Sequence, residues 1–287
     1  LRELNQIGEF AFCELSKVIP SFIRRAENSH KYFKDFQNYD IAKKNVFHNF
    51  AKKNLITEKT KVKEFVNLID YDEDAETKLL SALLYPYSEL SFIDIKEKIN
   101  NLPQFEKIKL IEKTIELRDH RRHKPARGLE MAFYTFDILG DYGVYRDLQR
   151  HRMLTQERQM LSTKFGYSTP YEIEDSGLGA DYHDAMERSA YAYDFISNDF
   201  PFEAQYVVPM GYNIRWFMHI NLRSLIWLTE IRSTPQGHAG YRKIAQEMFN
   251  KVEEVQPLLS KYMKFVDLDD YSLGRLSSEI RKENKKK

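Results

Sequence analysis

The stretch MAFYTFDILGDYGVYRDLQRHR, residues 131–152, contains the strand-to-helix change on which the predicted fold depends. Its first part, residues 131–138, has the alternating aromatic character that is typical of a β-strand. Gly140 and Asp141 end this strand, and aspartate is a good helix N-cap because its carboxylate accepts backbone N–H bonds. We therefore predict a strand followed by a helix that runs from Tyr142 towards Arg152.

The rest of the chain continues this mixture of helices and short strands. Apolar residues recur at helical spacing through residues 1–51, where Pro20 marks a break or the first turn of a second helix. A β-prone run at 62–69, closed by an acidic turn at 70–74, predicts a strand that enters a new domain. The other expected segments are helices at 75–84, 93–115 (interrupted at 100–103), 177–198, 221–231 and 240–255, extended stretches at 205–208 and 212–218, and a frayed, charged tail at 281–287.

The composition is that of a folded protein without an overall charge bias. The 287 residues include 44 Lys and Arg against 43 Asp and Glu, a net charge of +1, and 42% are hydrophobic. Cys13 is the only cysteine, which excludes an intrachain disulfide and a cysteine-based metal site. The sequence shows neither a signal-peptide pattern nor an apolar run near the roughly 18 residues of a membrane helix. We expect a cytoplasmic protein with no metal and no membrane partner.

Two basic clusters are candidate sites for a polyanion. Residues 118–127 carry five cationic side chains and one carboxylate, a local charge of +4, and Arg146 is followed by Arg150, His151 and Arg152. Guanidinium groups bind phosphate oxygens in bidentate fashion, and a helix from Tyr142 would place Arg146 and Arg150 on one face. The alternative is a solvated, salt-bridged surface, which is the commoner role of a charge run.

A third candidate lies on the predicted helix at 221–231. Arg223 and Trp227 share a face there, where they could bind a planar heterocycle, or the helix could belong to the core with arginines that reach out to solvent. Gly-rich phosphate loops, GxSxG, CxxC and HExxH motifs are all absent from the sequence. Any redox or transfer chemistry would therefore come from a cofactor.

Two ordered segments resemble the signature blocks of the flavin-dependent thymidylate synthases, the ThyX family. They are RDLQRHRMLTQERQMLSTKFGYSTP, residues 146–170, and VVPMGYNIRWFMHINLRSLIWLTEIRSTPQGHA, residues 207–239. The resemblance implies an α+β fold for residues 55–287, with a central, mainly antiparallel sheet flanked by helices. It also implies that the extra helical segment, residues 1–54, is the end of a preceding copy, as in the second, partly degenerate copy of a tandem form.

The resemblance also implies an activity: transfer of a one-carbon unit from methylenetetrahydrofolate to dUMP, which makes dTMP with FAD and NADPH in sites between the subunits of a homo-oligomer. Its implied site residues are, for FAD, Arg150, His151, Arg152, Asn221 and Arg223, and for dUMP, Arg150, Ser162, Lys164 and Arg232. Arg232 matches the catalytic arginine that favours ionisation of the uracil ring, because a fixed cation stabilises the negative charge that develops there.

The chain departs from the family pattern at several nucleotide-contacting positions. Ser162 matches the dUMP-binding serine only if two residues are inserted, since Met160 stands at the expected place, and Lys164 then replaces an arginine. Four further departures are Asp147 for a glutamine, Gln205 for an arginine, Trp227 for an asparagine and Glu130 for a histidine. These leave two functions open: an active thymidylate synthase, or a catalytically degenerate domain with a structural or oligomerisation role. A nucleic-acid-binding module is disfavoured by the net charge of +1.

Overall fold

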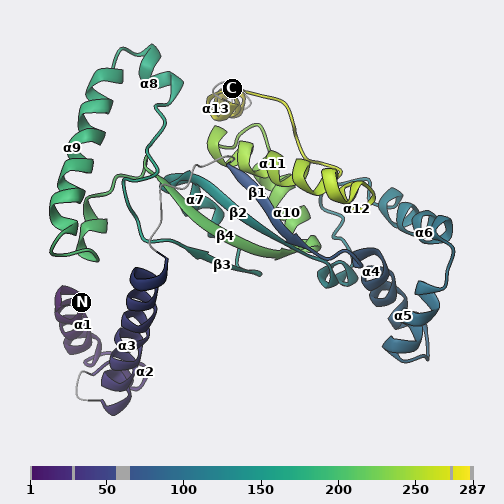
Figure 1. The fold of residues 1–287 in the computed structure, drawn as a ribbon, viewed down its shortest axis with the longest axis horizontal. Coiled ribbons are helices and arrows are strands. Elements are labelled where there is room, and N and C mark those ends of the chain that lie inside the picture. The colour runs from purple at the N-terminus through teal and green to yellow at the C-terminus, as the bar shows by residue number, and fades with distance from the viewer. Residues whose placement is uncertain (1, 28–29, 56–64, 272–273, 285–287) are drawn as a thin grey trace. The chain divides into compact units, whose positions relative to one another are not determined.

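The computed structural model describes residues 2–27, 30–55, 65–271 and 274–284, and it divides the chain into two compact units, Leu1–Val62 and Lys63–Lys287 (Figure 1). The first unit confirms the helical prediction for its described residues. Its elements are α1 (Arg2–Leu15), α2 (Pro20–Ile23), the 3-10 helix η1 (Arg24–Ala26) and α3 (Lys31–Asn54). Pro20 is the first residue of α2, where its missing N–H costs no helical hydrogen bond. That this segment ends a preceding copy stays a prediction.

The second unit is built on a four-stranded antiparallel sheet with the order β1-β2-β4-β3. The strands are β1 (Val66–Tyr71), β2 (Phe133–Asp141), β3 (Leu154–Arg158) and β4 (Asn213–Asn221). The two central strands, β2 and β4, pair along their whole length, and alternate side chains from both are buried. The predicted α+β fold with a mainly antiparallel sheet is thus confirmed.

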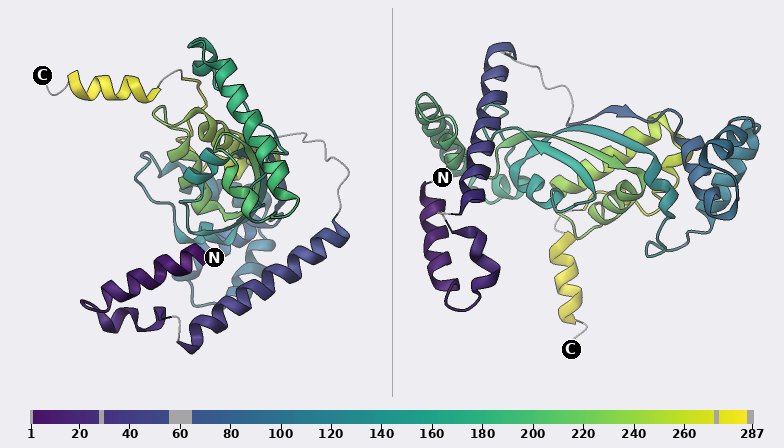
Figure 2. Two further views of the ribbon diagram at one scale, coloured as in Figure 1. Left: turned by 90° about the vertical axis from the view of Figure 1, so that its left-hand side faces the viewer. Right: turned by 90° about the horizontal axis from the view of Figure 1, so that it is seen from below.

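Helices cover the sheet and extend from its ends (Figures 1 and 2). The α-helices of this unit are α4 (Ala75–Leu84), α5 (Phe92–Asn100), α6 (Gln104–Glu116), α7 (Tyr142–Leu148), α8 (Tyr171–Asp175), α9 (Gly179–Ser197), α10 (Leu222–Arg232), α11 (Ala239–Val255), α12 (Pro257–Ser260) and α13 (Gly274–Asn284), and the 3-10 helices are η2 (Tyr85–Tyr87), η3 (Arg127–Met131) and η4 (Glu203–Val207). Helix α11 packs on β1, β2, α7 and α10. The core between them includes Trp216 and Met218 of β4, Leu225 of α10 and Met248 and Val252 of α11. No described helix is both long and apolar enough to cross a membrane.

The predicted strand-to-helix change is confirmed, but the helix is shorter than predicted. The Asp141 carboxylate accepts the Val144 N–H at 2.7 Å and caps α7. The helix ends at Leu148, so Arg146 and Arg150 do not share a helical face as expected. The cause is the next strand: the chain must turn between Leu148 and Leu154, and the Gln156 side chain holds this turn by donating to the Gln149 and His151 carbonyls.

Three other sequence-based expectations differ from the structure. The sequence predicts no strand between residues 152 and 177, whereas the structure has β3 there. Residues 205–208 are expected to be extended, but they belong largely to η4. The Gln205 side chain holds this turn, because it accepts from the Leu161 N–H at 2.9 Å and donates to the Phe202 carbonyl at 3.2 Å. The tail is helical as far as Asn284, and residues 285–287 lie outside the described part of the chain.

Candidate functional site

The turn between α7 and β3 carries the Arg150-His151-Arg152 triplet. Arg150 is exposed and forms a 3.4 Å ion pair with Asp147. His151 is half-buried, and its N–H donates to the Leu148 carbonyl, which fixes the turn. Arg152 is exposed immediately before β3. The three consecutive side chains therefore project from a short, hydrogen-bonded turn, and they do not share one helical face.

Helix α10 follows β4 directly and supplies the residues that lie across from the Arg150-His151-Arg152 triplet. The Asn221 side chain accepts the Ser224 N–H at 2.9 Å, so Asn221 is the N-cap of α10. Arg223 donates from Nε to the Pro125 carbonyl at 2.9 Å and forms a 2.7 Å ion pair with Glu130. Trp227 lies one turn further along the same face and is 52% exposed.

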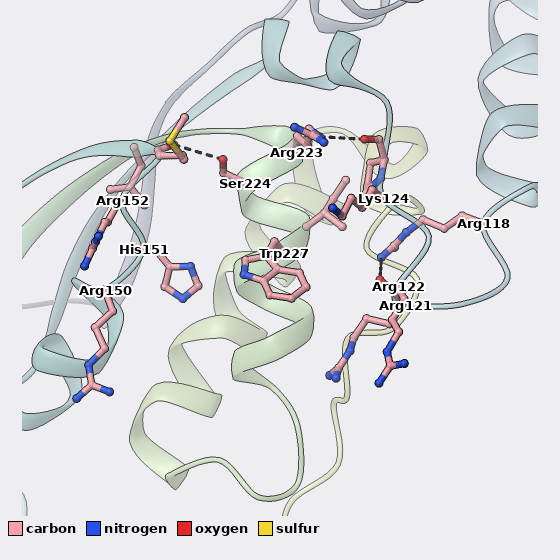
Figure 3. Close-up of a pocket in the computed structure, with 14 residues that line it drawn as sticks. Arg118, Arg121, Arg122, Lys124, Arg150, His151, Arg152, Arg223, Ser224 and Trp227 are labelled. Atoms are coloured by element: carbon pink, nitrogen blue, oxygen red, sulfur yellow. Dashed lines mark hydrogen bonds between the residues drawn. The ribbon is translucent and has the colours of Figure 1, made fainter.

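These segments line one cavity of about 720 Å³ (Figure 3). The lining residues are Arg118, Arg121, Arg122, Lys124, Pro125, Arg150, His151, Arg152, Met153, Leu154, Arg223, Ser224, Ile226 and Trp227. The indole of Trp227 lies between the triplet on one side and Arg121 and Arg122 on the other (Figure 3). An aromatic ring among several guanidinium groups suits a ligand with a planar ring system and anionic groups.

The sequence leaves two roles open for the basic segment 118–127, a polyanion site and a salt-bridged surface. The structure shows cavity-lining and ion-paired residues side by side in this segment. Arg121, Arg122 and Lys124 are exposed and line the cavity. Arg118 is instead buried in an ion pair with Glu230 of α10, and Arg127 is exposed and pairs with Glu130 at 3.3 Å. Sequence reasoning could not separate these residues, because all of them belong to one short run of like charges.

Arg232 lies behind His151, which itself lines the cavity. Arg232 donates from Nε to His151 Nε2 at 3.1 Å and from Nη2 to the Asp147 carbonyl at 2.8 Å, and it lies over the Tyr241 ring. Burial, and then the nearby Arg232 cation, lower the pKa of His151 to about 4. His151 is therefore neutral near pH 7, and the cationic members of the triplet are its two arginines.

The cavity includes four of the eight residues expected to bind cofactor or substrate: Arg150, His151, Arg152 and Arg223. Arg232 reaches it only through His151, and Asn221 is engaged as a helix cap. Ser162 is buried and Lys164 exposed in the segment after β3, and neither lines the cavity. Their roles as dUMP ligands stay predictions, as does that of Asn221 in flavin binding.

His238 lies at a different cavity. Its Nδ1 accepts the Gly240 N–H at 3.1 Å, which makes it the N-cap of α11. Together with Asp141 and Lys243 it lines a space of about 470 Å³ at the starts of α7 and α11. Burial raises the pKa of Asp141 there, against the cap hydrogen bond from Val144.

Comparison with known proteins gives one family and several relatives. The family described as "Thymidylate synthase complementing protein" matches residues 67–258. A "UPF0159 protein" of Chlamydia muridarum is 43% identical over 282 residues, which cover 98% of this chain and 53% of the relative. A "Flavin-dependent thymidylate synthase" of Sulfolobus acidocaldarius is 31% identical over 159 residues, 51% of this chain and 59% of that protein.

Among solved structures, the fold is similar to that of a UMP/dUMP methylase, PolB, from Streptomyces cacaoi, bound with 5-Br dUMP. The TM-score is 0.52 at 16% identity, and the match covers 70% of this chain and 94% of the other. The chain spans about half the length of the two chlamydial relatives that it matches.

Proposed function

The chain belongs to the family of thymidylate synthase complementing proteins, the ThyX family, and on that premise we propose that it is a flavin-dependent thymidylate synthase that converts dUMP to dTMP. The cosubstrates would be methylenetetrahydrofolate, which donates the one-carbon unit, and NADPH, which donates electrons. One observation carries the proposal: Arg150, Arg152 and Arg223 line a single cavity together with the half-exposed Trp227.

The residues of this cavity fit a flavin nucleotide. Trp227 is about half exposed and offers an indole ring on which a planar isoalloxazine can stack, and the arginines can neutralise phosphate groups. Met153, Leu154 and Ile226 add apolar side chains to the wall, which would shield part of the ring from water. When bound, the reduced flavin would supply electrons and a carrier for the one-carbon unit.

The chain's own residues would position the reactants and stabilise charge. Arg150, at the rim of the cavity, is placed to bind the phosphate of dUMP once it leaves the weak pair with Asp147. Arg232 is a fixed cation behind His151 and would stabilise negative charge that develops on the uracil ring. Ser162 and Lys164 would complete the nucleotide site from a second subunit or a tandem copy, which accounts for their positions outside this cavity.

A catalytically degenerate domain is the second candidate, and one observation favours it. Glu130 stands where the family has a histidine, and it pairs with Arg223, one of the proposed flavin-binding arginines. The nearby Arg127 and Arg223 cations lower the pKa of Glu130, so this carboxylate is charged at the site. In that case the domain would serve assembly with a partner domain, and its cavity would not turn over substrate.

A binding experiment separates the two candidates. The purified full chain is examined for a flavin absorption spectrum, titrated with dUMP, and assayed for dTMP formation with NADPH and methylenetetrahydrofolate. Bound FAD and dTMP formation are expected, and Arg150→Ala should lose both while Arg188→Ala, an exposed change on α9, keeps them. A chain that binds FAD but forms no dTMP would support the degenerate domain, and one that takes up no FAD would exclude the proposed synthase.

A further inference from the structure

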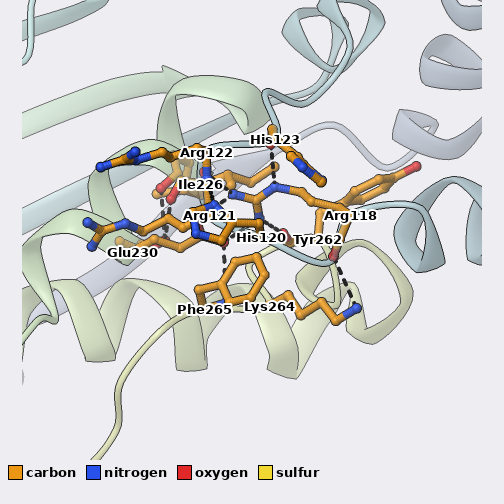
Figure 4. A network of polar contacts seen from close by, with 12 residues as sticks. Arg118, His120, Arg121, Arg122, His123, Ile226, Glu230, Tyr262, Lys264 and Phe265 are labelled. Atoms are coloured by element: carbon orange, nitrogen blue, oxygen red, sulfur yellow. Dashed lines mark hydrogen bonds and ion pairs between the residues drawn. The ribbon is translucent and has the colours of Figure 1, made fainter.

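The buried Arg118 side chain holds the basic loop, defined here as residues 119–124, in one conformation (Figure 4). Arg118 Nη1 donates to Glu230 at 2.5 Å and Nη2 donates to the other oxygen of Glu230 at 2.6 Å. The remaining donors bind three carbonyls, those of His123 at 2.9 Å, Tyr262 at 2.9 Å and Arg121 at 3.2 Å. All five N–H groups of the guanidinium are thereby used, so Arg118 has no donor left for a ligand.

Both partners of this ion pair are removed from solvent. The side chain of Glu230 is 0% exposed and that of Arg118 is 7% exposed. Lys264 donates to the Arg118 carbonyl at 3.1 Å, the Phe265 N–H donates to Glu230 at 3.3 Å, and the Phe265 ring lies against the guanidinium. The pair therefore joins the segment just after α6, the last turn of α10 and residues 262–265.

This anchoring decides where the loop side chains go. The carbonyls of Arg121 and His123 point inward to Arg118, while the side chains of Arg121, Arg122 and Lys124 stay exposed and line the cavity. Among the described residues no carboxylate pairs with any of the three. Three unpaired like charges in one short loop repel each other, and a bound anion would remove that repulsion.

We propose that Arg121, Arg122 and Lys124 form a second anion subsite that binds the diphosphate of a dinucleotide, separate from the Arg150 and Arg152 side of the cavity. The inference rests on the proposed binding of a planar cofactor at Trp227, which lies between the two cationic sides (Figure 3). Two guanidinium groups and one ammonium group match the several oxygens of a diphosphate, with bidentate bonds from each arginine. Arg118 and Glu230 are positioning residues for this subsite.

The test compares dinucleotides with mononucleotides. The triple variant, tested in the full chain, carries Arg121→Gln, Arg122→Gln and Lys124→Gln. It should bind FAD at least about tenfold more weakly, because charge-assisted hydrogen bonds to the diphosphate are lost. Its affinity for FMN should stay within about twofold of that of the unchanged chain. Arg188→Gln on α9 is the matched control and should change neither affinity. If NADPH alone is weakened, the diphosphate belongs to the nicotinamide cofactor. Equal losses for FAD and FMN, or no loss for any dinucleotide, would overturn the subsite.

A second arm separates this inference from the proposed function. If the chain takes up no flavin at all, the subsite is tested by calorimetry with inorganic pyrophosphate and ADP. Binding to the unchanged chain that the triple variant loses would support the subsite although the synthase proposal has failed. Absence of pyrophosphate and ADP binding would overturn the subsite as well.

The positioning role has its own variant. The double variant Arg118→Met, Glu230→Met removes both charges together. Proteins often lose little stability from such a change, whereas removal of one partner leaves an uncompensated buried charge. The double variant should fold, as monitored by circular dichroism, and should weaken FAD about as much as the triple variant while FMN affinity is unchanged. An unchanged ratio of FAD to FMN affinity in the folded double variant would show that the pair does not position the loop. If the double variant fails to fold, Glu230→Asp provides the same readout.

Discussion

Arg232 Nε and His151 Nε2 are 3.1 Å apart, and since a guanidinium can only donate, the imidazole must accept at this nitrogen. His151 is therefore neutral with its proton on Nδ1, and it separates the Arg232 cation from the cavity. The pKa of about 4 is consistent with this geometry, because protonation would place two like charges in contact.

We expect stability to fall in acid because of His151. The folded-state pKa of His151 is about 4, against the usual histidine pKa of 6.5. Between these pH values the unfolded chain binds more protons, so the free energy of unfolding decreases as the pH falls. With a discount for partial exposure, the loss is on the order of 2 kcal/mol below pH 4. Urea unfolding across this range should show a flatter pH dependence for His151→Gln. His183→Gln, at an exposed histidine, should behave like the unchanged chain; an identical slope for His151→Gln would contradict the assignment.

We expect Trp227 to report ligand binding and to carry much of the affinity. Since the side chain is 52% exposed, Trp227→Ala should change the free energy of unfolding by less than about 1 kcal/mol, while loss of ring stacking should weaken flavin binding about tenfold or more. The chain has two tryptophans, and the other, Trp216, is buried in the core. Fluorescence quenching by added flavin should therefore be retained in Trp216→Phe and lost in Trp227→Phe. Quenching that survives in Trp227→Phe would place the ligand elsewhere.

Asn221 offers a test of cap against ligand contact. Asn221→Asp keeps the oxygen that accepts the Ser224 N–H, whereas Asn221→Ala loses it and should cost about 1 kcal/mol in thermal or urea unfolding. If Asn221 acts only as a cap, flavin affinity measured under conditions where both proteins are fully folded should be the same in Asn221→Asp and the unchanged chain. A selective loss of affinity in the stable Asn221→Asp variant would establish the predicted flavin contact.

The Arg118–Glu230 pair should dominate the charge contribution to stability. Glu230→Gln leaves the Arg118 guanidinium buried without a counter-charge and should lower the free energy of unfolding by about 3 kcal/mol or more. Asp184→Asn breaks the exposed pair with Arg188 on α9 and should cost less than about 1 kcal/mol. Chemical denaturation of both variants measures the difference. Similar small losses would mean that the buried pair does not anchor the basic loop.

The features that could be predicted from sequence are those with local signals. Asp141 and Asn221 both follow an alternating strand and precede a helix, and the cap chemistry of each lies within three residues. The pairing of Arg223 with Trp227 on one helix face is likewise a matter of helical spacing. In each case the helix begins within one residue of the position that the local pattern predicts.

The features that could not be predicted depend on distant partners. Strand β3 is a short edge strand with little apolar alternation, and it exists because it pairs with β4 from Leu154 opposite Ile220. Arg118 differs from its basic neighbours through distant partners, chiefly Glu230, 112 residues further along the chain. No sequence window of ordinary length contains either relationship.

The position of β3 also limits how the chain can vary in length. The strand begins two residues after Arg152, and its side chains alternate between the two faces of the sheet. One residue inserted before Leu154 would shift the pairing with β4 and turn Leu154 and Gln156 to the opposite face, releasing the turn that Gln156 holds. Insertions and deletions among natural or engineered versions of this domain should therefore collect after Arg158, and the spacing from Arg150 to Leu154 should stay constant.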